Sequence, residues 1–261
     1  MTSVFSINLE GKRAWVTGAS RGIGKATALA LANAGCDVAV GFHKGEAEAQ
    51  AVVAEIVALG RKAIAIGGDV AVAAECERMH STMAKELGHI EILVNNAGVQ
   101  QNNMFLLLET ADWERVLGTN LMGTVNATRA VLKSMWARKA GRIINVSSVA
   151  ATRGSRGQAN YVASKGAIEA MTQSLAVEFA PRKITVNCIA PGAVDTEIWE
   201  DAWDESRRQA VIDRQLVKRF GTADEIAGWV VMLASSYGEF LTGETLHLDG
   251  GWQRAWEFAR T

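Results

Sequence analysis

Tyr161 and Lys165 are the residues whose types and spacing most clearly allow chemistry. They follow an apolar segment, 141–146, that ends in the hydroxyls of Ser147 and Ser148. Residues four apart share one face of a helix, so the Lys165 ammonium can lie one turn from the Tyr161 phenol. A neighbouring cation favours the phenolate and lets a tyrosine exchange a proton near neutral pH. Ser148 could hydrogen-bond the same substrate oxygen. The alternative is an exposed tyrosine and lysine on an amphipathic helix.

Alternating strands and helices would position these side chains. Strands are expected at 14–17, 38–42, 63–66, 92–95, 142–146, 184–189 and 245–248, and helices at 23–34, 46–59, 73–87, 113–138, 161–179 and 223–234. Strands that are apolar on both faces, alternating with long helices, are typical of a parallel sheet covered on both sides. We therefore predict an α/β fold: one Rossmann domain over residues 1–261, with a doubly wound, seven-stranded parallel sheet. Ligands bind such sheets beyond the carboxyl ends of the strands.

Composition restricts the classes of function. The 261 residues are 49% hydrophobic and 21% charged, with a net charge of −1, so nothing favours a nucleic-acid or membrane partner. Cys36, Cys76 and Cys188 are scattered and are expected to be reduced core thiols, and no metal site is predicted. No apolar segment approaches the ~18 residues of a membrane-spanning helix. We expect a cytoplasmic protein.

The segment 17–24 indicates a dinucleotide site. Gly18, Gly22 and Gly24 follow the first expected strand and open the first helix. Glycines permit a tight turn and a close approach of the backbone to a pyrophosphate at the helix N-terminus. Structural glycines alone would give the same spacing, but the strand–turn–helix context favours a dinucleotide.

Together these motifs resemble the short-chain dehydrogenase/reductase family, over residues 11–251. The resemblance rests on 17–24, Asp69-Val70, 95–98, Asn120, Ser148, Tyr161-x-x-x-Lys165 and Pro191-Gly192. The glycine spacing G-x-x-x-G-x-G differs from the more common G-x-G-x-x-G. Segments 157–161 and 242–246 look most like those of 3-oxoacyl-carrier-protein reductases.

The resemblance implies a role for each residue of the expected catalytic set. Tyr161 would be the general acid for ketone reduction, and Lys165 would lower its pKa and hold the nicotinamide ribose. Ser148 would orient the carbonyl, and Asn120 would hold a water that relays protons to Lys165. We choose Ser148 over Ser147 because it lies thirteen residues before Tyr161, as in these reductases.

The resemblance also implies a set of cofactor-binding residues. Asp69 would accept from the adenine amino group, residues 96–98 would line the adenosine, and 191–196 would cover the nicotinamide. The predicted set is Gly18, Ser20, Arg21, Gly22, Ile23, Gly24, His43, Lys44, Asp69, Val70, Asn96, Ala97, Gly98, Tyr161, Lys165, Pro191, Gly192, Val194 and Thr196.

The end of the second strand bears on which nicotinamide cofactor binds. Phe42 takes the place of the acid that usually accepts from the ribose 2′-hydroxyl in NAD enzymes. Arg21, His43 and Lys44 could attract a 2′-phosphate. NADP(H) is therefore predicted, with NAD(H) left open because His43 and Lys44 could simply be solvated.

The substrate is left open between two classes. One is a 3-oxoacyl thioester on an acyl-carrier protein, and the other is a sugar or polyol that could be anionic. Lys139 can serve at one cationic docking position for a carrier protein, whereas Val177 occupies another that is usually arginine. Segment 190–220 is implied to be the substrate lid. Weaker candidates for substrate contacts are Arg153, Gln158, Trp199 and Trp203.

Two further hypotheses concern the chain ends and the class of protein. Residues 1–10 form a lead-in, and the aromatic tail 252–261 extends past the point where many relatives end. The resemblance implies a homotetramer, so one hypothesis is that the tail packs on a neighbouring subunit. A non-catalytic dinucleotide-binding protein is the alternative of a different class, because a fold does not fix a function.

Overall fold

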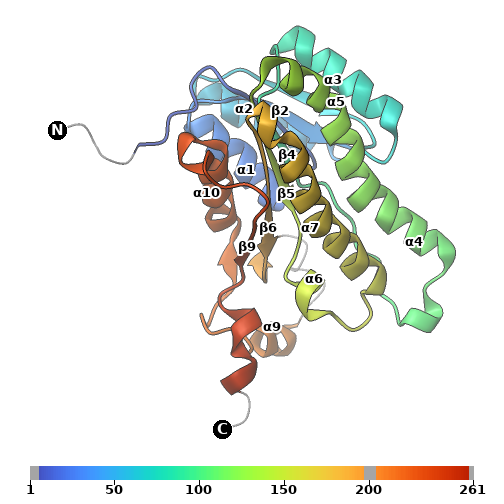
Figure 1. Cartoon of the computed structure of the whole chain (residues 1–261). Coiled ribbons are helices and arrows are strands. Elements are labelled where there is room, and N and C mark those ends of the chain that lie inside the picture. The colour runs from blue at the N-terminus through green and yellow to red at the C-terminus, as the bar shows by residue number, and fades with distance from the viewer. Residues whose placement is uncertain (1–5, 197–203, 259–261) are drawn as a thin grey trace.

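Seven parallel strands form the centre of the computed structural model, which describes residues 6–196 and 204–258 (Figure 1). The strands are β1 (Arg13–Val16), β2 (Asp37–Phe42), β3 (Ala63–Gly67), β4 (Ile92–Asn95), β5 (Gly141–Val146), β6 (Ile184–Pro191) and β9 (Thr245–Leu248). Their order across the sheet is β3-β2-β1-β4-β5-β6-β9. The chain therefore reverses direction across the sheet between β3 and β4, and a crevice for ligands is expected at that switch point. The predicted fold class is confirmed.

Helices cover both faces of the sheet. They are α1 (Gly22–Asn33), α2 (Glu46–Ala58), α3 (Ala73–Glu86), α4 (Thr110–Leu117), α5 (Gly123–Arg138), α7 (Ala159–Phe179) and α10 (Ala223–Ala234). Neighbouring strand residues such as Trp15 and Val16 are both fully buried, and they belong to two different core clusters. Val16 packs with α1, α2 and α10, and Trp15 packs with α3, α5 and α7. This two-sided burial explains why the strands are apolar on both faces.

The helix expected at 113–138 is interrupted. A π-helical turn, Gly118–Met122, separates α4 from α5, and within it the amide of Gly123 donates to the carbonyl of Gly118. An inserted residue of this kind leaves the apolar periodicity on either side almost unchanged, so the sequence pattern did not reveal it. Its consequence is local: the turn carries Asn120, which is fully buried.

A smaller layer lies beyond the carboxyl ends of the strands, at the lower end of the molecule in Figure 1. It contains α6 (Ala150–Arg153), α9 (Glu205–Ile212), the short pair β7 (Val194–Asp195) and β8 (Gly221–Thr222), and a 3-10 turn at Trp252–Phe258. Phe220 and Val211 pack together here in a separate small core. This layer borders the edge of the sheet where a ligand is expected.

Two sequence-based expectations about the remaining residues can be compared with the structure. The three cysteines are free and buried, and burial raises the pKa of each thiol to about 12, so they are core residues. Within residues 6–196 and 204–258, no helix combines the length and apolar character that crossing a membrane requires.

Candidate active site

The glycine-rich turn joins β1 to α1 with no room for larger side chains. Gly18 and Gly22 have φ angles of +63° and +55°, which residues with a Cβ rarely adopt. A Cβ on Gly24 would lie 2.2 Å from the carbonyl oxygen of Gly18 and 2.5 Å from Nδ2 of Asn96. The turn is therefore packed so closely against the end of β4 that only glycine fits at position 24. The structure describes all of the first turn of α1, and this turn contains no acidic residue.

The end of β4 holds this turn in place. Nδ2 of Asn96 donates to the carbonyl oxygens of Thr17 and Gly18, at 3.0 and 2.9 Å. Oγ1 of Thr17 accepts from the backbone amides of Asn96 and Ala97, at 3.0 Å each. A Cβ on Gly18 would come within 2.9 Å of the Ala97 Cα. Thr17 was not among the predicted site residues, because a strand-end threonine carries no signal of its own.

The loop after β2 lies beside the glycine turn. A Cβ on Gly45 would be 3.6 Å from Oγ of Ser20 and 3.0 Å from Oε2 of Glu48. The exposed His43 ring places Nδ1 3.6 Å from Oδ1 of Asp69. The predicted cationic surface near a 2′-phosphate therefore also contains a carboxylate, Glu48, which the sequence reasoning did not consider.

Three of the predicted cofactor residues serve mainly in packing. Ile23 is partly buried against the core beside α1. Val70 is buried, and a Cβ on Gly123 of α5 would lie only 2.6 Å from its Cγ2. Val194 is buried in the same core as Ile23. Each fixes the backbone of a site segment by its apolar side chain.

The segment after β6 faces the glycine turn. A Cβ on Gly22 would lie 3.6 Å from Cγ2 of Thr196, so the two segments approach each other closely. Pro191 ends β6, and a Cβ on Gly192 would come within 2.7 Å of the Asp249 Cα. The backbone at Gly192 is thus held against the residues that follow β9.

Tyr161 lies on the first turn of α7 and is partly buried. Burial raises the pKa of its phenol, and hydrogen bonds with the side chains of Ser148 and Gln100 oppose this rise. The net direction is the reverse of the lowering that we expected from Lys165. Gln100, in the loop after β4, was not predicted, because a glutamine in a polar loop has no diagnostic spacing.

Lys165 is buried beneath Tyr161, with 4% of its surface exposed. Its Nζ donates to the carbonyl oxygen of Val146 at 2.7 Å and lies 5.6 Å from the centre of the Tyr161 ring. Burial lowers the pKa of Lys165 to about 8. A Cβ on Gly98 would be 3.6 Å from this Nζ, so the glycine leaves space beside the ammonium.

Geometry separates the two adjacent serines. The Ser147 hydroxyl donates to Oε1 of Glu169 at 2.7 Å and lies 3.1 Å from the carbonyl oxygen of Lys165, inside the core. The Ser148 hydroxyl instead hydrogen-bonds with Tyr161 and accepts from the amide of Ala150 at 3.2 Å. Only Ser148 of the two is beside the phenol, as its spacing predicts.

Asn120 links the π-helical turn to the helix that carries Tyr161. Its Oδ1 accepts from the Val99 amide at 2.8 Å, and its Nδ2 donates to the Val99 carbonyl and to Oγ of Ser164, each at 3.0 Å. Ser164 in turn donates to the Tyr161 carbonyl at 2.7 Å. These contacts make Asn120 a brace between two walls of the site.

A row of amides borders the phenol. Nε2 of Gln158 donates to Oε1 of Gln100 at 3.2 Å and to Oδ1 of Asn102 at 3.1 Å. Arg115 of α4 donates to the carbonyl of Gln100 at 3.3 Å. The predicted substrate candidate Gln158 is therefore joined to Tyr161 through Gln100. This wall is polar and can accept or donate hydrogen bonds.

The other substrate candidates lie elsewhere. Arg153, at the end of α6, donates to the carbonyl of Trp252, and its guanidinium lies 5.8 Å from the centre of that indole ring. The tail thus begins by packing on its own chain, and packing of the tail on a neighbouring subunit stays a prediction. Trp199 and Trp203 lie outside the described residues.

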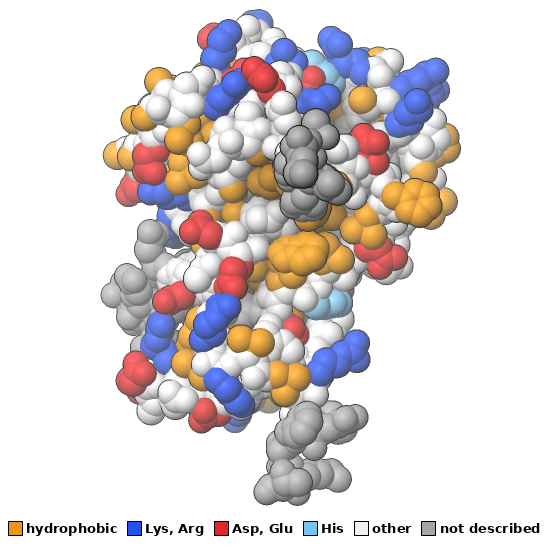
Figure 2. Space-filling view, turned by 90° about the vertical axis from the view of Figure 1, so that its left-hand side faces the viewer, with side chains coloured by type: hydrophobic (Ala, Val, Ile, Leu, Met, Phe, Trp, Pro, Cys, Tyr) orange, Lys and Arg blue, Asp and Glu red, His pale blue; other side chains and the backbone are white. Residues whose placement is uncertain are grey.

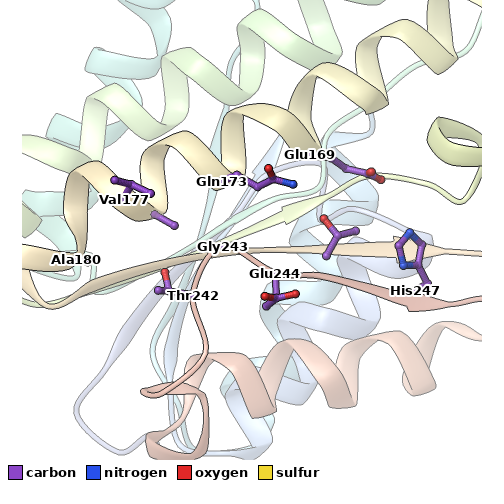
Figure 3. A pocket seen from close by; sticks show the side chains of 10 residues that line it. Glu169, Gln173, Val177, Ala180, Thr242, Gly243, Glu244 and His247 are labelled. Atoms are coloured by element: carbon purple, nitrogen blue, oxygen red, sulfur yellow. The ribbon is translucent and has the colours of Figure 1, made fainter.

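A hollow of about 820 Å³ opens between α7 and the segment that leads into β9 (Figure 3). Glu169, Gln173, Glu244 and His247 lie along it. Tyr161, Lys165, Ser148 and Asn120 are not among its lining residues in the described chain. The hollow is therefore separate from the cluster around Tyr161.

Comparison with known proteins agrees with this geometry. Residues 12–207 match the family model for short chain dehydrogenase. The chain is 42% identical over 244 residues to a 3-oxoacyl-[acyl-carrier-protein] reductase of Synechocystis sp., covering 93% of this chain and 97% of that protein. It is 41% identical over 240 residues to the 3-oxoacyl-[acyl-carrier-protein] reductase FabG of Staphylococcus aureus, with coverage of 92% and 97%.

A solved structure extends the comparison. The gluconate 5-dehydrogenase of Burkholderia cenocepacia, in complex with NADP and tartrate, superposes with a TM-score of 0.90 at 33% identity, covering 95% of this chain and 97% of that one. Reductases and dehydrogenases of this fold share one reaction class, so family membership implies use of NAD(P). The chain belongs to the short-chain dehydrogenase family and is an oxidoreductase that acts on CH–OH groups.

Proposed function

We propose that the protein interconverts a ketone and a secondary alcohol with NADP(H), and that Tyr161 transfers the proton. The observation that carries this proposal is the contact of the Tyr161 phenol with the side chains of Ser148 and Gln100, above the buried Lys165. A phenol held between two hydrogen-bonding side chains can give a proton to a substrate oxygen at the same position. Ser148 then orients that oxygen.

The residues present fit a dinucleotide. Gly18, Gly22 and Gly24 shape the tight turn that leads to the N-terminus of α1, where the helix dipole favours a phosphate. Arg21 precedes α1, and His43 and Lys44 follow β2, on the side where a 2′-phosphate would lie. The remaining binding residues are those predicted from the sequence, with Asp69 and 96–98 at the adenosine and 191–196 at the nicotinamide. When bound, the nicotinamide supplies or accepts the hydride.

The protein's own side chains supply the proton that the substrate oxygen gains in reduction. In the reductive direction Tyr161 gives its proton to the developing alkoxide, while Ser148 hydrogen-bonds the same oxygen. The Lys165 ammonium, 5.6 Å from the ring centre, stabilises the phenolate that remains. Asn120 braces the helix of Tyr161 through Ser164 and stands beside Lys165, where the proton must be replaced.

The first candidate substrate is a 3-oxoacyl thioester, supported by the two reductases at 41–42% identity. A basic surface suits an acidic carrier protein: Arg182 stacks 4.4 Å from the Trp136 ring centre, close to Arg129 and Lys133. Lys139 ends α5 on the same side. The other expected position, Val177, is an exposed valine that offers no charge.

The second candidate is a sugar or polyol, and a specific feature favours it. Gln100, Gln158 and Asn102 form a hydrogen-bonded polar wall beside Tyr161. Such amides can bind hydroxyl groups next to the reacting carbon, whereas an acyl chain gains nothing from them. The gluconate 5-dehydrogenase complex with tartrate is a relative whose name indicates a polyhydroxylated substrate.

Two activity measurements test these proposals together. The first follows NADPH oxidation with a small 3-oxoacyl thioester, and the second follows NADP⁺ reduction with gluconate, each repeated with the NAD form. We expect turnover with the thioester and a preference for NADPH. Turnover with gluconate and none with the thioester would mean that the substrate is a sugar acid and not an acyl thioester. Absence of both activities in folded protein that binds NADPH would exclude these two substrates, and Tyr161→Phe would then have no activity to remove.

Self-association is part of the proposal. Hydrophobic side chains gather over the middle of the face in Figure 2. Exposed aromatic residues on and after α10 include Trp229 and Phe240. Surfaces of this kind commonly mark protein interfaces. We expect a homotetramer located in the cytoplasm. Light scattering coupled to gel filtration measures the assembly, and a monomer at micromolar concentration would contradict it.

A further inference from the structure

The residues after β9 fold back across the layer beyond the sheet, at the lower end of Figure 1. Asp249 fixes their path, because its two carboxylate oxygens accept from the amides of Gly251 and Gln253, each at 2.9 Å. Gly250 and Gly251 have φ angles of +61° and +79°, so the reversal depends on glycine. This turn places Trp252 and Gln253 beside α6.

Trp252 and Gln253 contact the loop between Ser148 and Tyr161. Arg153 donates to the Trp252 carbonyl, and its guanidinium lies over the indole ring at 5.8 Å. Nε2 of Gln253 donates to Oγ1 of Thr152 at 2.6 Å. Two neighbouring tail residues therefore hold two neighbouring residues of α6 by three separate contacts.

The same indole contacts the opposite wall. Trp252 packs on the small core of Ala193, Val211 and Phe220, which joins the segment after β6 to α9. Arg208 of α9 lies 4.7 Å from the Phe220 ring centre and pairs with Asp195 at 3.0 Å. The contacts run without a break from the segment expected over the nicotinamide to the loop that follows Ser148.

We propose that Trp252 is a positioning residue, which joins the loop 149–158 to residues 193–196 and 205–220 of the same chain and so fixes the shape of the substrate site. Arg153 acts as its partner on α6, and Gln253 adds a second attachment at Thr152. The kinetic side of this proposal rests on the proposed function, because Gln158 of this loop contacts Gln100 beside the Tyr161 phenol and the amide of Val149 donates to the carbonyl of Pro191. The contacts lie outside the reacting atoms, so Trp252 affects substrate binding and not the proton transfer.

Kinetics of Trp252→Ala, Arg153→Met and the double variant test the coupling. Each single change removes the cation–π contact, and each is expected to raise KM about tenfold with less than a twofold change in kcat. The double variant should raise KM by clearly less than the product of the two single effects, because both changes remove the same cation–π contact. Val57→Ala, which shortens an exposed apolar side chain on α2, away from every contact described above, is the control and should leave KM unchanged. Multiplicative effects of the two changes would overturn the proposal.

Hydrogen exchange provides a readout that does not require a substrate. Trp252→Ala should speed amide exchange in peptides covering both 149–158 and 205–213, while exchange in β1 and β4 stays unchanged. Unchanged exchange in 149–158 would overturn the proposal even if KM rose. If Trp252→Ala does not fold, Arg153→Met decides the question, since that side chain is exposed. Absence of turnover with every substrate would count against the proposed function alone, because the exchange measurement still tests the contact.

Discussion

Replacing the buried lysine beneath Tyr161 should stabilise the fold and destroy its chemistry. Burial lowers the pKa of Lys165 from 10.5 to about 8. At ~1.4 kcal/mol per pH unit, this fall corresponds to ~3 kcal/mol of cost for keeping the ammonium in the folded protein. Loss of the 2.7 Å hydrogen bond to Val146 offsets about 1 kcal/mol of the gain. Lys165→Met should therefore raise the free energy of unfolding by ~2 kcal/mol at pH 7.

The effect of Lys165 on the free energy of unfolding should depend on pH. Because the pKa of Lys165 falls on folding, the cost is present in full below pH about 8, where the folded and unfolded states are both protonated. It fades as the pH rises towards 10.5, the ordinary value for lysine, above which both states are neutral. The stability of the wild-type protein should therefore rise relative to that of Lys165→Met between pH 8 and 10.5.

Thermal unfolding at pH 7 and pH 10 measures this difference. For a chain of this length each kcal/mol moves the Tm by roughly 2–4 °C, so the variant should melt about 4–8 °C higher at pH 7. The gap should shrink at pH 10, and turnover should fall at least ~100-fold at either pH. Lys133→Met on the exposed surface of α5 is the control, with little change expected. A Lys165→Met variant that melts lower than wild type, by the same margin at both pH values, would refute the reasoning.

Four further substitutions test individual side chains. Ser148→Ala should lower kcat by about 100-fold, whereas Ser147→Ala should cost about 1 kcal/mol of stability and leave kcat nearly unchanged; similar kinetics for the two would contradict the choice between them. Tyr161→Phe should lower kcat at least ~100-fold and keep the Kd for NADPH, measured by fluorescence titration, whereas retained turnover would remove the tyrosine from the reaction. Glu48→Gln should lower KM for NADPH roughly two- to fivefold and leave KM for NADH unchanged, and equal shifts would exclude a 2′-phosphate effect.

Patterns along the chain were enough to predict most of the fold. The strands at 92–95 and 245–248 and the helix at 223–234 have the expected bounds, and the other boundaries differ by at most two residues, apart from the interrupted helix. Buried parallel strands and amphipathic helices differ in period and length, so they are readable from one sequence. The π-helical turn at Gly118–Met122 was missed, because two helices in line produce nearly the same periodicity as one.

The site was only partly predictable, for a different reason. Spacing along a helix or at a strand end brought Ser148, Tyr161 and Lys165 together, and the structure has them adjacent. Gln100 and Trp252 reach the site from loops far away in the sequence, and no local spacing marks them. The sequence also does not show how deeply Tyr161 is buried. The predicted direction of the shift in its pKa was therefore wrong.

That correction changes what the site should do at different pH values. Burial raises the pKa of Tyr161 and lowers that of Lys165, so both side chains are driven towards their neutral forms. A neutral phenol is ready to protonate a ketone oxygen, whereas alcohol oxidation first requires the phenolate. Between pH 6 and 9 we therefore expect kcat/KM for reduction to change less than about threefold. Over the same range kcat/KM for oxidation should rise by up to about tenfold per pH unit. A flat profile for oxidation would mean that Lys165 and the bound dinucleotide lower the pKa of Tyr161 below 6, against the effect of burial.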